Sequence, residues 1–292
     1  MTSLQNAATR LSDSAWCVIG GGNMASAIVL GAIEAGVLAP DRFVVVEVDA
    51  EKRASFQSRG IVAAEEIGDG IRQILRSVSA TDAAHILLAV KPQALASVAG
   101  VVRAALEETT VRTRVVSILA GTPTSKLESL LGPGARVLRA MPNTPARIRR
   151  GTTAIACGRS CGAGDEGPAR ALFGSLGTVV DLDESLFDAF TAVAGSGPAY
   201  VFYLAEALIE AAVAQGFTRV QAELAVRSML AGSSELLMRE SGQSAAALRA
   251  AVTSKGGTTA AATQVFDDAR LMEIVSRAID RATERGRELS KG

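Results

Sequence analysis

A short run near the C-terminal end, Val252–Thr259, contains the residue types of a binding site for a small acid. Its adjacent glycines, Gly256 and Gly257, allow backbone N–H groups to approach a ligand closely. An apolar pattern with helical spacing starts directly after the run, and the N–H groups at a helix start attract anions. Thr258 and Thr259 add hydroxyl groups that can donate a proton. We expect a carboxylate held beside a hydroxyl donor; an ordinary helix cap without a ligand is the alternative.

A second run with chemical capacity, Gly20–Ala25, follows the strand-like segment Ala15–Ile19 and precedes an apolar helical pattern. It reads G-x-G-x-x-A, in which the first glycine makes a tight turn and the second lets the backbone approach a pyrophosphate. The small third residue permits close packing of helix on sheet. This context predicts dinucleotide binding, with contacts from Ile19, Gly20, Gly22, Asn23 and Met24.

An acidic residue, Glu47, ends the next strand-like run about 25 residues after the glycines, near the usual place of the ribose contact. Glu47 could accept hydrogen bonds from ribose hydroxyls and would repel a 2′-phosphate. Lys52 and Arg53 follow and could instead attract that phosphate, or all these residues could be surface charges. Either NADPH or NADH is therefore the expected cofactor.

Ala89, Val90, Lys91 and Pro92 close a further strand at its C-terminal edge, where open α/β sheets bind ligands. We expect these four residues to contact the cofactor, with Pro92 beginning a helix. His85 lies at the entry to the same strand, which is the opposite edge, and is expected to be structural.

The elements that must position these runs alternate between strand and helix in the first half of the chain. Apolar runs rich in β-branched residues, separated by helical spacing, predict a parallel sheet covered on both faces. The predicted strands are Ala15–Ile19, Arg42–Val48, Ile86–Val90, Arg114–Ile118, Arg136–Ala140, Thr152–Cys157 and Thr178–Asp181. The predicted helices between them are Met24–Ala35, Glu51–Ser58, Gln93–Leu106 and Asp165–Leu176, while 65–84 is a connection without a clear pattern.

From residue 183 the apolar spacing becomes helical throughout, with breaks at Gly195–Pro198, Gly216, Ser241–Gly242 and Ser254–Gly257. The expected fold is therefore α/β: an N-terminal Rossmann-type dinucleotide-binding domain (1–182) and a C-terminal all-α domain (183–292).

Composition excludes several classes of function. Lys+Arg and Asp+Glu are 30 each, so nothing points to nucleic acid or a membrane surface. A single histidine argues against histidine-based catalysis and two-histidine metal sites. Cys157 and Cys161 have no histidine nearby, so we expect no metal and reduced thiols in a cytoplasmic protein. The polar start Met1–Ala15 lacks the apolar core of a signal peptide, and the longest apolar run, Pro198–Gly216, contains two glutamates.

Five segments in order make the chain resemble pyrroline-5-carboxylate reductase, from about residue 15 to residue 289. They are Gly20–Met24, Ala89–Pro92, Met141–Pro145, Ala194–Tyr200 and Val252–Thr259. The first is common to many dehydrogenases, whereas the last two at this spacing are specific.

The resemblance implies reduction of 1-pyrroline-5-carboxylate to L-proline by hydride from NAD(P)H, the last step of proline biosynthesis. It implies a helical domain that interlocks with a second copy, giving a homodimer or a higher assembly of dimers. The active site would lie between the cofactor domain and helices contributed partly by the neighbour.

Carried over by position, the substrate contacts would be Val252, Ser254, Gly256, Gly257, Thr258, Thr259, Gly195 and Ser196. Thr259 would hydrogen-bond the ring nitrogen and is the expected catalytic residue. Two departures from the family are Ser244–Ala246, where a His-Pro-Gly-like helix start is common, and the longer 65–84 stretch.

Two other functions fit parts of the pattern. A β-hydroxyacid-type dehydrogenase shares the plan but uses a lysine of the helical domain, and no lysine occurs between Lys126 and Lys255. A non-catalytic dinucleotide sensor would keep the fold without turnover. The paired glycines and threonines favour a substrate over the sensor.

Overall fold

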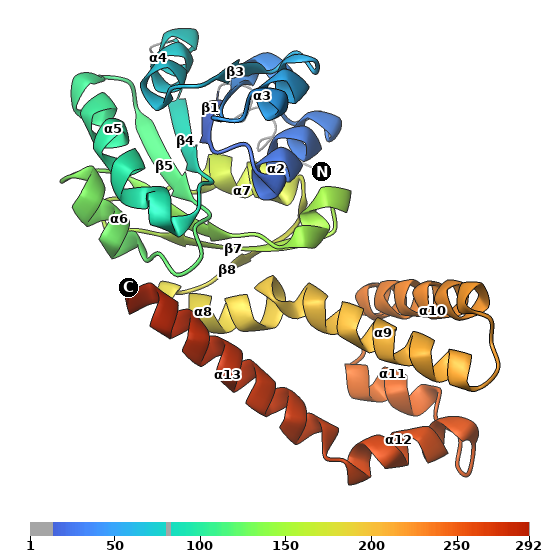
Figure 1. The fold of residues 1–292 in the computed structure, drawn as a ribbon. Helices are drawn as coiled ribbons and strands as arrows, with labels where there is room; N and C mark the ends of the chain where they lie inside the picture. Colours follow the sequence, from blue (N-terminus) through green and yellow to red (C-terminus); the bar gives the residue numbers. More distant parts are fainter. Residues whose placement is uncertain (1–13, 80–82, 292) are drawn as a thin grey trace. The chain divides into compact units, whose positions relative to one another are not determined.

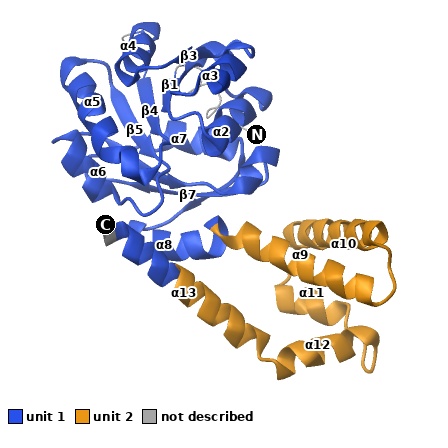
Figure 2. Ribbon diagram, in the orientation of Figure 1, with its two compact units in different colours: residues 1–195, 283–292 blue, residues 196–282 orange. Residues whose placement is uncertain are grey.

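The computed structural model describes residues 14–79 and 83–291 (Figure 1). The chain forms two compact units: residues 1–195 with 283–292, and residues 196–282 (Figure 2). The domain boundary was predicted at residue 182, directly after the last strand. The first compact unit instead extends to Gly195. The expectation about a leader at residues 1–13 lies outside the described residues.

The first unit is built on one eight-stranded sheet with the order β3-β2-β1-β4-β5-β6-β7-β8. The strands are β1 (Ser14–Ile19), β2 (Phe43–Val46), β3 (Val62–Ala64), β4 (Ala83–Leu88), β5 (Thr113–Ser117), β6 (Val137–Met141), β7 (Gly151–Cys157) and β8 (Gly177–Asp181). All neighbouring pairs are parallel except β6 and β7, which are antiparallel. The predicted parallel sheet is confirmed apart from this pair, which is antiparallel because the short connection through 142–150 returns the chain directly.

Helices cover both faces of the sheet, as predicted (Figure 1). They are α2 (Asn23–Glu34), α3 (Ala50–Gln57), α4 (Ile67–Ser77), α5 (Leu95–Glu108), α6 (Thr124–Leu131), α7 (Gly167–Gly174) and α8 (Phe187–Phe190). Short turns are η1 (Pro40–Arg42), η2 (Pro92–Ala94), η3 (Thr144–Ile148), η4 (Glu184–Leu186) and the π-helical η5 (Thr191–Gly195).

Successive side chains of β1 pack alternately into two hydrophobic cores, one on each face of the sheet. Trp16 and Val18 join the core cluster that contains residues of α2 and α7, whereas Cys17 and Ile19 join the cluster with residues of α4, α5 and α6. Successive side chains of a strand point to opposite faces, so burial on both sides produces the continuous apolar run in the sequence.

The stretch 65–84 has more structure than the sequence indicated. The helix α4 forms within it and packs Ile71 and Ile74 into the core, although residues 80–82 lie outside the described part. The short strand β3 just before it and the eight-residue helix α6 were not predicted either.

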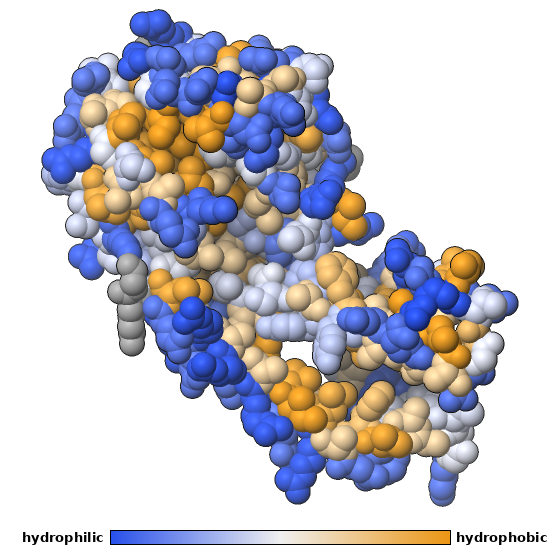
Figure 3. All heavy atoms as spheres, in the orientation of Figure 1, coloured by the Kyte–Doolittle hydropathy of each residue, from blue (hydrophilic) through white to orange (hydrophobic). Residues whose placement is uncertain are grey.

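The second unit is helical, as expected. Its helices are α9 (Gly197–Ala214), α10 (Arg219–Arg239), α11 (Ala245–Ala251), α12 (Thr258–Asp268) and the first part of α13 (Leu271–Lys291), whose last residues belong to the first unit. Within residues 196–282, all of them described, only Ala222 and Val226 are buried apolar residues. Many large apolar side chains of this unit are exposed (Figure 3).

One helical stretch, Glu184–Ala214, is long and apolar enough to cross a membrane by length and composition, with 6% of its most apolar window buried. It includes most of the expected run Pro198–Gly216, with the two glutamates Glu206 and Glu210. The expected break at Gly195–Pro198 is only a change from π-helical to α-helical turns, so the run begins upstream of Pro198.

Candidate active site

The glycine turn lies where three strands of the sheet end. The N–H of Gly20 donates to the carbonyl oxygen of Val46 over 2.8 Å, and the N–H of Ala89 donates to that of Ile19 over 2.9 Å. Gly20 has a φ of +101°, and a Cβ atom there would come within 2.7 Å of the Ala89 oxygen. Only glycine therefore fits this position, as the motif predicted.

Gly22 leaves the start of α2 open. It occupies the N-cap position with no side-chain cap, and the first turn has no acidic residue. A Cβ atom at Gly22 would meet nothing within 4 Å, and Asn23 beside it is exposed. The free N–H groups and the positive end of the helix dipole therefore suit a phosphate. Ala25 is 1% exposed and supplies the close helix–sheet contact.

The carboxylate of Glu47 faces the glycine turn. Its Oε2 atom accepts a hydrogen bond from the N–H of Gly21 over 2.8 Å, and Oε1 accepts from the N–H of Asp49 over 3.0 Å. Glu47 is thereby fixed directly after β2, where a ribose would be read.

The cations that follow Glu47 are already paired. Nη1 of Arg53 donates to the carbonyl oxygens of Glu47 and Val48, each over 2.8 Å, and Nη2 pairs with Glu65 over 2.8 Å. Lys52 lies 3.8 Å from Asp49. Arg53 therefore braces the turn that carries Glu47.

Ala89, Val90, Lys91 and Pro92 follow β4 at the same sheet edge as the glycine turn, and Pro92 begins η2, as predicted. Lys91 is exposed.

His85 is buried within β4 and stacks on Trp16, with ring centroids 4.4 Å apart. Its Nε2 atom lies 3.3 Å from Ser14 Oγ at the first residue of β1, and burial, with smaller contributions from nearby arginines, lowers its pKa to about 3. This neutral histidine fills the core away from the cofactor edge.

Asn143 is a positioning residue that the sequence reasoning missed. Its side chain is mostly buried; Nδ2 donates to the carbonyl oxygen of Ala194 over 2.9 Å, and Oδ1 accepts from the N–H of Thr152 over 2.9 Å. The amide thus fixes η5, whose last residue is the predicted substrate contact Gly195. Asn143 lies in the segment Met141–Pro145, which contributed to the family resemblance but was given no structural role.

The loop before α12, in the second unit, carries the residues of the predicted acid site. Gly256 has a φ of +72°, and the N–H of Gly257 donates to the carbonyl oxygen of Ser254 over 3.0 Å. α12 begins at Thr258 with Gly257 in the cap position, no side-chain cap and no acid in the first turn. The helix start therefore does not use its own hydroxyls as caps.

The other predicted substrate contacts lie at element ends. Val252 follows α11 and is 66% exposed, and Ser196 stands at the N-cap of α9. The unusual Ser244 caps α11, its Oγ accepting from the N–H of Ala247 over 3.1 Å. Among residues 14–79 and 83–291, no group of three or more His, Cys, Asp or Glu side chains could hold a metal ion.

Comparison with known proteins identifies both parts of the chain. Residues 184–289 match the family described as pyrroline-5-carboxylate reductase dimerisation, and residues 16–121 match NADP oxidoreductase, coenzyme F420-dependent. The chain is 33% identical over 274 residues to pyrroline-5-carboxylate reductase of Methanosarcina acetivorans, covering 94% of this chain and 97% of that protein. It is 35% identical to the Mycobacterium leprae enzyme, covering 93% and 95% of the two chains.

The fold agrees with these relatives. A solved pyrroline-5-carboxylate reductase structure from Coxiella burnetii superimposes with a TM-score of 0.84 at 33% identity, covering 97% of this chain and 100% of that one. On this sequence and structural likeness, the chain belongs to the pyrroline-5-carboxylate reductase family.

Proposed function

We propose that the chain reduces 1-pyrroline-5-carboxylate to L-proline with NADPH or NADH, the last step of proline biosynthesis. The observation that carries the proposal is the start of α12: an uncapped helix N-terminus after two glycines, with Thr259 in its first turn. An anion site next to a hydroxyl suits a small cyclic imine that bears a carboxylate. The first unit holds the cofactor at the glycine turn.

The proposed roles use the N–H groups of the glycine loop and the helix start, among which that of Gly257 has to exchange its bond to the carbonyl oxygen of Ser254 for the carboxylate. The N–H groups of Gly256, Gly257 and Thr258 bind the carboxylate, and the hydroxyl of Thr259 donates to the ring nitrogen. That hydrogen bond polarises the C=N bond and makes its carbon a better hydride acceptor. Bound NAD(P)H supplies the hydride. Holding the substrate in one orientation supplies several kcal/mol of the barrier reduction, so no strong acid or base is needed.

The remaining substrate contacts are proposed to shape the pocket. Val252 and Ser254 flank the carboxylate site, and Gly195 and Ser196 border the nicotinamide, with Asn143 holding their segment in place. Ile19, Gly20, Gly22, Asn23 and Met24 surround the pyrophosphate, Glu47 contacts the ribose, and Ala89, Val90, Lys91 and Pro92 line the same edge.

The apolar surface of the second unit supports assembly with a second copy. Phe202 and Tyr203 of α9 are 67% and 75% exposed, and Met272 of α13 is 71% exposed. Large apolar side chains exposed in this number support an interface with another chain. We propose a homodimer, or a higher assembly of dimers, in the cytoplasm. A second chain, rather than lipid, covers Glu184–Ala214. We expect no nucleic-acid partner, because the net charge is zero.

A turnover assay tests the proposal. Purified protein is mixed with synthetic 1-pyrroline-5-carboxylate and each reduced cofactor, and the loss of cofactor absorbance is followed together with the appearance of proline. We expect proline in a one-to-one ratio with oxidised cofactor. Tight cofactor binding without oxidation of either cofactor would instead indicate a dinucleotide sensor. Activity on a β-hydroxyacid with the oxidised cofactor, and none on the imine, would indicate the other dehydrogenase class.

A further inference from the structure

Two of the three cysteines come together at one end of the sheet in the first unit. Cys157 is the last residue of β7, and Cys161 lies in the loop that leads to α7. In the antiparallel ladder Cys157 stands opposite Leu138, and opposite residues project on the same face. Leu138 belongs to the core cluster against which Cys161 packs. Both thiols therefore lie on one face.

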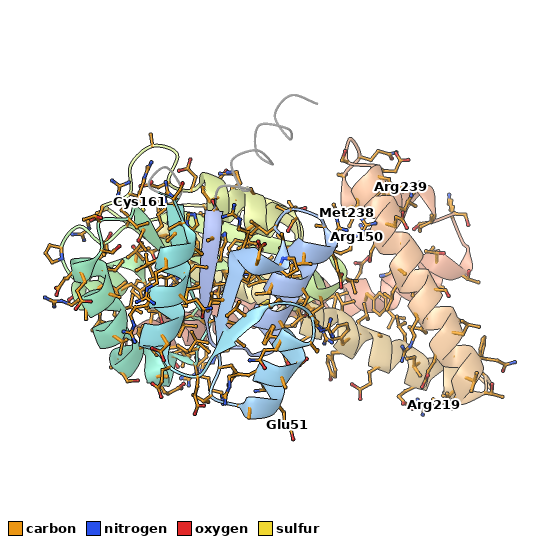
Figure 4. All side chains as sticks on the ribbon, turned by 90° about the horizontal axis from the view of Figure 1, so that it is seen from above. Glu51, Arg150, Cys161, Arg219, Met238 and Arg239 are labelled. Carbon is orange, nitrogen blue, oxygen red and sulfur yellow. The ribbon has the colours of Figure 1, made fainter. Side chains whose placement is uncertain are left out.

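The loop between the two cysteines is fixed to β6. The carbonyl oxygen of Val137 accepts a hydrogen bond from the N–H of Gly158 over 2.8 Å and from the thiol of Cys161 over 3.1 Å. The Val137 carbonyl that Cys161 contacts belongs to the residue next to Leu138, and Leu138 stands opposite Cys157, so the two thiols lie close together. Cys157 is exposed and Cys161 is half-buried. Figure 4 labels Cys161 on its loop.

The contact makes the two thiols chemically unequal. The neighbouring thiol of Cys161 lowers the pKa of Cys157, although burial and the carboxylates of Glu166 and Asp165 oppose this effect. The same contact and burial raise the pKa of Cys161. An exposed thiol with a lowered pKa is the more reactive nucleophile, and a neighbouring thiol can resolve its oxidised form.

We propose that Cys157 and Cys161 form a reversible intramolecular disulfide when the protein meets a peroxide. The thiolate of Cys157 attacks one peroxide oxygen; an S–O bond forms, the O–O bond breaks, and hydroxide leaves and takes up a proton. The sulfur of Cys161 then attacks the sulfenic acid; the S–S bond forms, the S–O bond breaks, and water leaves with the thiol proton. The two thiols are oxidised by two electrons, and one hydrogen peroxide is reduced to two waters.

The disulfide would restrain the loop that leads to a cluster of buried charges. The N–H of Gly162, in this loop, donates to Oδ2 of Asp165 over 2.8 Å. Oδ1 of the fully buried Asp165 pairs with Nε of Arg114 over 2.8 Å, and two further arginines, Arg112 and Arg136, reach the same carboxylate. A cross-link that fits the native loop restricts the unfolded chain, so the oxidised protein should melt at a higher temperature than the reduced one.

The test uses the full-length protein and the third cysteine as an internal control. Cys17 is fully buried in β1, and burial raises its pKa to about 12, so it stays unreactive in the native protein. After hydrogen peroxide treatment we expect two of the three thiols to be lost to titration, and the mass to fall by two hydrogen atoms. Unreduced peptide mapping should show a Cys157–Cys161 bridge, which dithiothreitol removes.

Matched variants separate this outcome from general oxidation. Cys17→Ala should form the bridge at the wild-type rate, whereas Cys157→Ser should leave Cys161 titratable. Oxidation of Cys157 to the sulfinic acid with Cys161 still free would overturn the proposal, as would cross-links mainly between chains. The readouts are thiol count and mass, so they do not depend on whether the protein reduces the imine.

Discussion

Asn143 donates a hydrogen bond to the carbonyl oxygen of Ala194 over 2.9 Å and so joins the turn after β6 to the π-helical end of the first unit. Oδ1 of the same side chain accepts a hydrogen bond from the N–H of Thr152. Both ends of the amide are used, one as a donor and one as an acceptor. The geometry of Gly195, next in the chain, therefore depends on a single amide.

Asn143→Ala should destabilise the first unit and lower turnover. Removal of the amide leaves two backbone groups without their partner, each at a cost of about 1–3 kcal/mol where the group stays dry. Urea unfolding measures the loss, with the exposed Gln57→Ala as control. Asn143→Asp should keep the bond from Thr152 and lose the one to Ala194, so its deficit should lie mainly in kcat. Variants as stable and active as the control would contradict this role.

Thr259→Val should reduce kcat by roughly a hundredfold, because a positioned donor to the developing charge contributes on that order. The matched control is Thr258→Val, which removes a hydroxyl one residue earlier but keeps the backbone N–H proposed for the carboxylate. Steady-state kinetics over a range of pH compares the two. If both variants lost kcat equally, or if Thr259→Val lost none, Thr259 would not be the proton donor. The identity of the reaction would be unaffected.

Glu47→Ala should shift the cofactor ratio toward NADPH. Loss of a charged acceptor for the ribose should lower kcat/KM for NADH roughly tenfold, equivalent to about 1.4 kcal/mol. The reaction with NADPH should be unchanged or improved, because the negative charge that would oppose a 2′-phosphate is gone. Glu51→Ala, at an exposed acid in the first turn of α3, is the control (Figure 4). An unaltered NADPH/NADH ratio would show that Glu47 does not read the ribose.

The stability of the first unit should fall as the pH drops below 6.5, because His85 resists protonation in the fold. Burial lowers its pKa from 6.5 to about 3, so in this window the unfolded chain binds a proton that the folded chain does not. Each pH unit in that window should lower the free energy of unfolding by about 1.4 kcal/mol. The pKa of Asp165 falls from 3.8 to about 2, because hydrogen bonds and arginine charges outweigh burial; its effect therefore begins at lower pH.

Urea unfolding at pH 7 and at pH 5 checks this expectation. His85→Phe keeps a ring against Trp16 but has no proton to bind, so its stability should change less between the two pH values. The same slope in the variant and the wild type would assign the pH dependence to other groups.

Phe202→Glu should weaken the assembly of two copies. In the proposed interface, a charge in place of this apolar side chain would be left without water or a partner. Sedimentation velocity should show a shift toward monomer, while Gln57→Glu on α3 of the first unit should leave the assembly intact. A dimer of unchanged strength in Phe202→Glu would place the interface on other residues of the helical unit.

The sequence predicted the parts of this fold that depend on local pattern. The glycine turn from Gly20 to Ala25 and the buried strands β1 and β5 stand as expected, because each pattern is set within a few residues. The direction of β7 could not be predicted, because an apolar run buried on both faces has the same pattern in either direction. Asn143 was missed since its partners are 9 and 51 residues away.

The last residues of α13 belong to the first unit, although the whole second unit lies between them and the rest of that unit in the sequence. The first unit therefore cannot be completed until the second has been synthesised. Gly121, with a φ of +64°, lies so close to Leu289 that a Cβ atom would come within 3.2 Å, and Ser290 reaches Asp188 over 3.4 Å. On a ribosome the strands of the sheet can pair early, but their contact with α13 forms only after the residues from Thr283 onward have been synthesised. A chain that stops before Thr283 would have all the proposed cofactor and substrate residues and yet lack a part of its first unit.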